Sequence, residues 1–234
     1  MWLTVPLSRS LPTLGFPAIK KILLVACCLV LTACQSLPEI LDDDSQTGWL
    51  RQPDAFADRQ NDLAGYSVWE YRAKGAITAD NKSEQINILW QYADQGHAIR
   101  MFGPLGMGNV LVQYDEYSVR ISDNKGLRYQ GRDVSDLLQE VTGLVLPIGA
   151  LEYWLFAVPD PDAVFEYKLA SNESGDTSRI SDLRQLGWTL EFEDYREWRQ
   201  DLLLPRKITA RKDDPELGLI KIKLIAKNWQ IGSE

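Results

Sequence analysis

The sequence has few residues that could support covalent or redox chemistry. It contains three cysteines and a single histidine, His97. The cysteines are Cys27, Cys28 and Cys34, so all of them lie near the amino terminus. The remaining 200 residues therefore contain no disulfide framework. A lone histidine is usually a surface residue or one satisfied within the core, so we expect the fold to depend on an apolar core.

Recognisable catalytic motifs are also missing. The sequence has no G-x-S-x-G, S-x-x-K, H-E-x-x-H or phosphate-binding glycine loop. Glu191 and Glu193 have the spacing of one strand face, and paired carboxylates can perform acid–base chemistry. An outer face in water is the favoured interpretation. The acidic run 42–44 lacks calcium-loop spacing and indicates a solvated linker. We expect no enzymatic activity, no cofactor and no metal site.

A long apolar run is missing too, and the short one that is present indicates secretion. Residues 22–31 are apolar, but a spanning helix needs about 20 such residues. Lys20 and Lys21 precede the run, and Leu31-Thr32-Ala33-Cys34 ends it. A basic flank, a short apolar core and a small-residue cleavage site predict a signal peptide over residues 1–33.

The cysteine at this point resembles the lipobox of bacterial lipoproteins. The resemblance implies that Cys34 becomes the first residue and carries S-diacylglycerol and N-acyl groups, a stable anchor because it has more than one chain. The next residue is Gln35 rather than the aspartate that retains enterobacterial lipoproteins at the inner membrane. The resemblance therefore implies an outer-membrane lipoprotein whose body faces the periplasm.

Cleavage also changes the charge of the chain. The segment 1–33 holds three basic residues and no acidic one, so its removal takes the net charge from −8 to −11. So acidic a body argues against nucleic-acid binding and against broad adhesion to anionic lipid. Residues 34–47 are polar and acidic and predict a flexible tether. Residues 48–234 are expected to form a single domain.

Alternation of apolar and polar residues dominates the rest of the sequence. Ile86, Ile88 and Trp90 share one parity, and similar alternation recurs at 99–101, 117–121, 188–192 and 220–224. This period predicts about ten or eleven half-buried antiparallel strands. Helical spacing appears at 54–64, at 134–141 after a possible N-cap Asp133, and at 148–158. A mainly β fold is expected, with a strongly curved sheet capped by helices.

One loop carries apolar residues on turn-forming sequence. Gly103-Pro104-Leu105-Gly106-Met107-Gly108 separates two predicted strands. Proline and glycine favour an exposed turn, where Leu105 would contribute nothing to the core. A membrane or partner contact is one interpretation. The other is that Leu105 folds back over the core, and this loop alone favours neither.

Several short motifs in fixed order resemble the LolB family of outer-membrane lipoproteins. They are 88–91, the loop 103–106, 123–129, 146–148, Trp154-Leu155 with Val158-Pro159, Gly187-Trp188 and Asn228-Trp229. The lipobox separates this family from the related soluble carrier LolA. The resemblance covers about residues 49–230. Phe102-Gly103 departs from it, because the family often has a polar residue there.

The resemblance implies a half-open antiparallel β-barrel with a helical lid over an apolar cavity for acyl chains. It implies a monomer that accepts acylated lipoproteins from LolA and inserts them into the outer membrane, with LolA, the cargo and membrane lipid as partners. Pro104, Leu105 and Gly106 would form the membrane-insertion loop. We expect Ile88, Trp90, Ile99, Met101 and Trp154 to line the cavity, although either tryptophan could belong to the core.

Two other functions remain open from the sequence. A lipoprotein subunit of an envelope assembly could use the sheet edge and Leu105 for protein contacts. An anchored hydrolase is disfavoured, because nucleophile and base are missing. Co-purified acylated protein or lipid would favour the first interpretation, and a stable stoichiometric partner would favour the assembly subunit.

Overall fold

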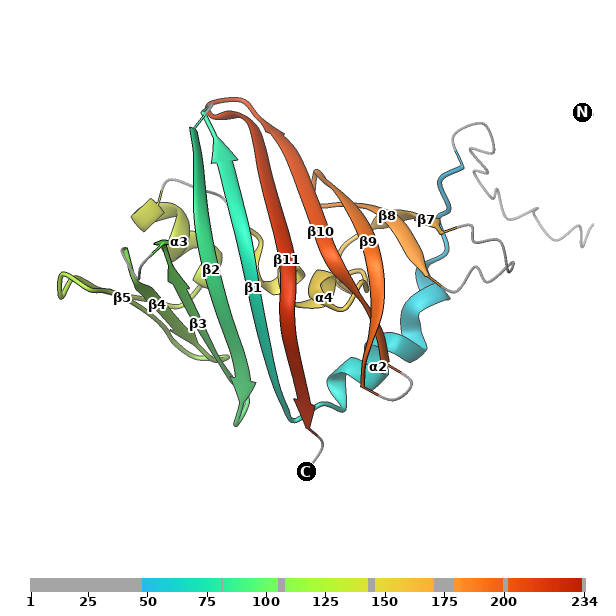
Figure 1. The fold of residues 1–234 in the computed structure, drawn as a ribbon, viewed down its shortest axis with the longest axis horizontal. Helices are drawn as coiled ribbons and strands as arrows, with labels where there is room; N and C mark the ends of the chain where they lie inside the picture. Colours follow the sequence, from blue (N-terminus) through green and yellow to red (C-terminus); the bar gives the residue numbers. More distant parts are fainter. Residues whose placement is uncertain are drawn as a thin grey trace, which may run out of the picture. The chain divides into compact units, whose positions relative to one another are not determined.

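A single antiparallel sheet dominates the computed structural model (Figure 1), which describes residues 48–80, 82–104, 108–142, 146–170, 179–199 and 202–232. The predicted signal peptide, Cys34 and the tether lie outside the described residues, as do Leu105 and Gly106. The described sheet has eleven strands in the order β6-β5-β4-β3-β2-β1-β11-β10-β9-β8-β7. It curves without closing on itself, so the predicted half-open barrel is confirmed.

The alternating segments of the sequence form these strands. Their bounds are β1 Val68–Ala79, β2 Lys82–Ala93, β3 Gly96–Phe102, β4 Val110–Tyr114, β5 Val119–Asp123, β6 Arg128–Gly131, β7 Phe165–Leu169, β8 Ile180–Gln185, β9 Trp188–Arg199, β10 Leu202–Asp214 and β11 Gly218–Gly232. The first and last strands pair at the centre of the sheet, from Val68 opposite Gly232 to Thr78 opposite Lys221.

The prediction for residues 117–121 was wrong at one residue. Tyr117 was placed on the buried face with Val119 and Ile121, but it is 79% exposed. It lies before β5 in a turn, where Asp115 Oδ1 accepts hydrogen bonds from the backbone N–H groups of Tyr117 and Ser118, both at 2.8 Å. An aspartate that satisfies turn donors in this way competes with strand pairing.

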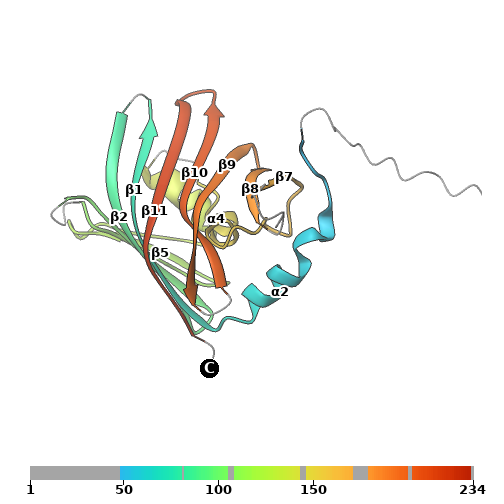
Figure 2. The same cartoon turned by 45° about the vertical axis from the view of Figure 1, so that its right-hand side comes forward.

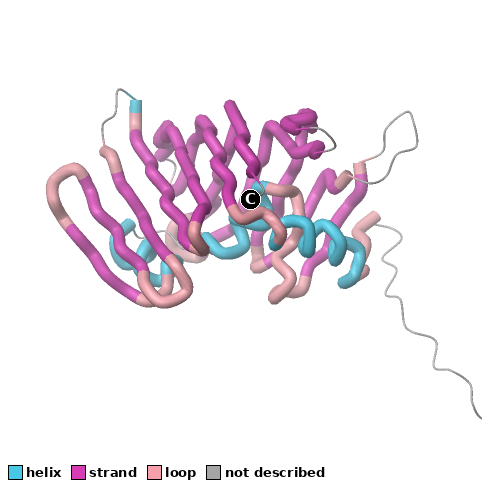
Figure 3. The backbone as a smooth tube through the Cα atoms, turned by 90° about the horizontal axis from the view of Figure 1, so that it is seen from below, coloured by secondary structure: helices cyan, strands magenta, loops and turns pink. Residues whose placement is uncertain are grey.

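The helices lie on the side toward which the sheet curves (Figures 2 and 3). They are the 3₁₀ turn η1 Pro53–Phe56 and the helices α2 Ala57–Ala64, α3 Val134–Thr142 and α4 Ile148–Leu155. The predicted N-cap of α3 is confirmed, because Asp133 Oδ1 accepts a 2.8 Å hydrogen bond from Asp136 N–H. α4 ends before the predicted residue 158, since Ala157 has φ of 54° and leaves the right-handed helical region.

The amino-terminal end of the described chain is fastened to one edge of the sheet. Leu50 and Tyr167 of β7 exchange two backbone hydrogen bonds, of 2.8 and 3.0 Å. Trp49 is buried beside them, with the Arg184 guanidinium 4.0 Å and the Lys168 ammonium 4.7 Å from the centre of its ring. Arg51 pairs with Glu166. Residues 49–51 thus cover part of the β7 edge.

Candidate functional site

A small cavity lies between the apolar face of the sheet and the helices α3 and α4. These two helices are called the lid here. Its volume is about 50 Å³. It is lined by Tyr71, Ile77, Ile86, Ile88, Trp90, Ile99, Met101, Val112, Leu138, Leu146, Ile148, Leu151, Leu155, Ile222 and Leu224. Nearly all of these side chains are aliphatic, so the cavity suits hydrocarbon and offers little to a polar ligand.

One end of this cavity is more exposed than the other. Along β2, Trp90 is buried while Ile88 and Ile86 are half-buried. On β3, Ile99 is buried and Met101 is half-buried. Exposure therefore increases toward the β1–β2 turn and toward the end of β3, where Pro104 is exposed. The predicted membrane loop follows directly from this end of β3.

α4 presents different residues to different surroundings. Successive residues of a helix are rotated by about 100°. Leu151 and Leu155 therefore share a face, and both line the cavity. Glu152 lies beside that face and approaches β3. Trp154 lies on the side of the helix opposite Glu152. Its indole N–H donates a 2.8 Å hydrogen bond to Gln185 Oε1, and its ring meets Trp188.

A chain of polar contacts runs from the cavity floor to the lid. Trp90 Nε1–H donates a 3.2 Å hydrogen bond to His97 Nδ1, and His97 Nε2 lies 3.4 Å from Glu152 Oε2. The imidazole stacks on Tyr114, with 4.5 Å between ring centres and 11° between planes. Since Nδ1 is an acceptor, neutral His97 carries its proton on Nε2, facing Glu152.

Burial shifts the proton affinities of this pair in opposite senses. The side chains of His97 and Glu152 are 10% and 24% exposed. Burial lowers the pKa of His97 to about 4, and burial raises the pKa of Glu152 to about 7. Protonation of Nδ1 would also break its hydrogen bond with Trp90, because both facing nitrogens would then be donors. His97 therefore stays neutral, and Glu152 is the group of the two that titrates near neutrality.

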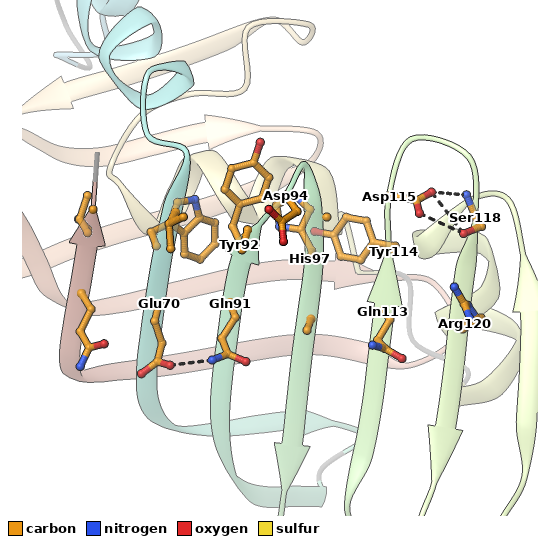
Figure 4. Close-up of a pocket in the computed structure, with 18 residues that line it drawn as sticks. Glu70, Gln91, Tyr92, Asp94, His97, Gln113, Tyr114, Asp115, Ser118 and Arg120 are labelled. Carbon is orange, nitrogen blue, oxygen red and sulfur yellow. Dashed lines mark hydrogen bonds between the residues drawn. The ribbon is translucent and has the colours of Figure 1, made fainter. Parts of the chain in front are cut away.

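A larger, open cleft of about 750 Å³ lies at another part of the sheet (Figure 4). Tyr92, His97 and Tyr114 stand side by side along it, and Glu70, Gln91, Gln113 and Arg120 form a second row on neighbouring strands. Gln91 Nε2 donates a 2.8 Å hydrogen bond to Glu70. This lining mixes polar and apolar side chains and is open to water, so the smaller cavity with its apolar lining is the better candidate for acyl chains despite its size.

Four of the five residues predicted to line a cavity are brought together by the fold. Ile88, Trp90, Ile99 and Met101 all line the apolar cavity. Trp154 does not line it and packs in the core beneath α4. Pro104 is exposed at the end of β3, whereas Leu105 and Gly106 fall outside the described residues, as does Cys34. His97 lies at the start of β3.

The sequence did not reveal the contact of Glu152 with His97. One signal was available, because Glu152 is the only charged residue in α4, whose sequence is otherwise apolar or aromatic. Its partner could not be found from spacing, since His97 lies on a different element. Within the described residues, no group of His, Cys, Asp or Glu has the arrangement of a metal site. No helix among the described residues has the length and apolar character needed to cross a membrane.

The family model described as outer membrane lipoprotein LolB matches residues 67–229. The chain belongs to the LolB family. The outer-membrane lipoprotein LolB of Francisella tularensis subsp. tularensis (strain WY96-3418) is 28% identical over 171 residues, covering 73% of this chain and 78% of that protein. The LolB of Chromohalobacter salexigens is 30% identical over 174 residues, covering 74% and 75%. That of Alkalilimnicola ehrlichii is 25% identical over 205 residues, covering 87% and 92%.

Membership fixes the general function and place of this chain. It is a lipid-anchored outer-membrane lipoprotein that acts in lipoprotein localization, and its family is not one of enzymes. The matched range contains the whole apolar cavity and both lid helices.

Proposed function

We propose that this LolB-family chain accepts acylated lipoproteins from the carrier LolA and inserts them into the outer membrane. The observation that supports this most directly is the cavity between the sheet and the lid, which is lined by apolar side chains and is more exposed at one end. Exposing acyl chains to water costs about 0.8 kcal/mol per CH₂. A cavity that binds them better than the carrier and worse than the bilayer would move cargo without an energy source.

In this proposal the lid must move for cargo to enter. The cavity of about 50 Å³ is far smaller than the roughly 300–1,000 Å³ of pockets that bury a small ligand. An acyl chain is many times larger than this cavity. In this proposal the described arrangement is the closed state, and acceptance would separate α3 and α4 from the sheet.

The acyl groups on Cys34 and the side chain of Leu105 would carry out the membrane steps. Cys34 tethers the body to the outer membrane through the segment 35–47, with the body in the periplasm as a monomer. Leu105 follows the more exposed end of the cavity lining by four residues, counted from Met101. Insertion of one leucine into lipid contributes about 1.5–3 kcal/mol, enough to orient a tethered body toward the bilayer.

A two-step transfer assay tests this function. Carrier-bound lipoprotein is incubated with the protein, and cargo is then scored on the protein and in liposomes. Leu105→Glu should keep acceptance and melting temperature near normal while strongly reducing incorporation into liposomes. Val164→Glu is the matched control, since Val164 is 91% exposed and does not line the cavity. A joint loss of acceptance, incorporation and melting temperature would identify Leu105 as a core residue.

A second arm of the same assay tests the cavity. Ile88→Glu places a charge in apolar surroundings, so acceptance should fall. Circular dichroism establishes that the variant is folded. A folded variant with normal acceptance would remove Ile88 from the cargo site. A wild-type protein that takes no cargo but holds a stoichiometric protein partner would favour the envelope-assembly function instead.

A further inference from the structure

We propose that Trp90, His97 and Glu152 form a proton-controlled latch on the lid: protonated Glu152 keeps α4 seated on the sheet, and loss of that proton to water favours opening. Only the purpose of this latch, the admission of acyl chains, rests on the proposed function. The latch itself is argued from contacts within the structure.

The latch joins the two walls of the apolar cavity. Trp90 lines the cavity from the sheet side, and Leu151, adjacent to Glu152, lines it from the lid side. His97 lies between them, held at Nδ1 by the Trp90 indole and facing Glu152 with Nε2 at 3.4 Å. Any movement of α4 away from the sheet must separate Glu152 from His97.

Few ionisable groups surround Glu152. From the sheet it meets His97 on β3 and Tyr114 on β4, and on its own helix it is next to Tyr153. α4 also packs against α3 and β10, and through Trp154 it contacts the non-ionisable residues Gln185 of β8 and Trp188 of β9. Burial is the cause of the raised pKa of Glu152, without a charged partner from α3, such as Glu140, or from β10, such as Arg206. No ion pair with Lys or Arg is recorded for Glu152 among the described residues.

The sign of the proton dependence follows from this burial. In the closed state the pKa of Glu152 is about 7, against 4.5 for an exposed glutamate. Between these values the closed state holds a proton that the open state has lost. Closure is therefore strongest below about pH 4.5, weakens as pH rises, and reaches its minimum above about pH 7. His97, with its pKa lowered to about 4, stays neutral through this window. At neutral pH a buried carboxylate destabilises the closed lid and prepares it to open.

Hydrogen–deuterium exchange of the α4 amides tests the latch without added lipoprotein cargo. The acylated full-length protein is held in phospholipid vesicles and pulse-labelled from pH 5 to pH 8, with correction for intrinsic exchange. Protection of α4 should fall by up to about tenfold per pH unit toward pH 7 and then level off. Glu152→Gln keeps the shape but cannot ionise, so protection should stay high at every pH. Glu140→Gln, an exposed substitution on the other lid helix, should behave as wild type.

Three results would overturn the latch: wild-type protection that does not change with pH, a Glu152→Gln variant that keeps the dependence, or a Glu140→Gln variant that loses it.

Uptake of a fluorescent dipalmitoyl lipopeptide then connects latch and function. Wild type should take up the lipopeptide faster at pH 7.5 than at pH 5.5, and the Glu152→Gln variant should take it up slowly at both pH values. Equal wild-type rates at the two pH values would show that the latch does not control uptake and would overturn its regulatory role. If wild type binds no lipopeptide at any pH, the proposed function fails while the exchange data still decide the latch.

Discussion

At the scale of single residues, Gln185 shows how a polar side chain can be fully used inside an apolar core. It is 3% exposed. Its Oε1 accepts hydrogen bonds from Trp154 Nε1–H at 2.8 Å and from Asp160 N–H at 2.9 Å. Its Nε2 donates to the carbonyl oxygens of Asp160 and Ala163 at 2.8 and 2.9 Å. One amide thus joins β8 to α4 and to the segment that leads into β7.

We predict that Gln185→Met lowers the free energy of unfolding by about 3 kcal/mol or more. The substitution keeps the volume but leaves two N–H groups and two carbonyl groups without partners, and each buried orphan costs about 1–3 kcal/mol. Chemical denaturation measures the change. Gln91→Met is the control, because Gln91 is exposed and should change stability by less than about 0.5 kcal/mol. Equal effects in both variants would show that the Gln185 amide is replaceable.

At the scale of elements, the central pairing of β1 with β11 depends on a close approach at Gly75. A Cβ on Gly75 would meet the Lys223 carbonyl oxygen at 2.7 Å and Leu224 Cδ2 at 2.9 Å. The first contact is with backbone of the paired strand, which cannot move aside without disturbing the register opposite Leu224. The glycine is therefore required by packing rather than by backbone conformation.

Gly75→Ala should accordingly destabilise the protein by about 1–3 kcal/mol, through overpacking at the strand pair. Gly149→Ala provides an opposite control, since Gly149 is exposed on α4 with no atom near its Cβ position. Alanine there should stabilise by about 0.4–1 kcal/mol. Thermal unfolding of both variants checks the pair. Stabilisation by Gly75→Ala would mean that β1 and β11 can move apart without loss of stability.

The elements were largely predictable because period and capping are local properties. Alternation at Trp188, Leu190 and Phe192 gave a strand whose inner residues are buried. Asp133 marked the start of α3 for the same reason. The end of α4 was not predictable in this way, because the left-handed conformation of Ala157 is imposed by surrounding structure.

Placement of side chains within the site was less accessible to sequence. The apolar character of Trp154 is equally suitable for core and for cavity, and only its rotation relative to Leu151 decides between them. The contact of Glu152 with His97 joins residues 55 positions apart, so no spacing rule reveals it. The cavity residues on the strand face could be predicted from the sequence, whereas those on the lid required the tertiary structure.

At the scale of the whole molecule, the predicted anchor and the folded body are separable. We predict that Cys34→Ala, secreted with a cleavable signal that leaves no site for acylation, stays in the soluble periplasmic fraction with an unchanged melting temperature. The lipid is the only strong attachment in the proposal, and a mature chain of net charge −11 should not adhere to anionic lipid. Fractionation after a high-salt wash measures this. Persistent membrane association would reveal a second anchor.

The small backbone bridge between Leu50 and Tyr167 has a consequence for solubility. A sheet left open to admit a ligand has two free edges, and free edges are where chains of different molecules pair and aggregate. On the β7 side, Leu50 occupies the two hydrogen-bonding positions of Tyr167 that a second molecule could otherwise use. On the other side the last strand, β6, has only four residues, which limits the ladder that a neighbour can build. The fold can thus stay open toward cargo while giving other copies of itself little edge on which to polymerise.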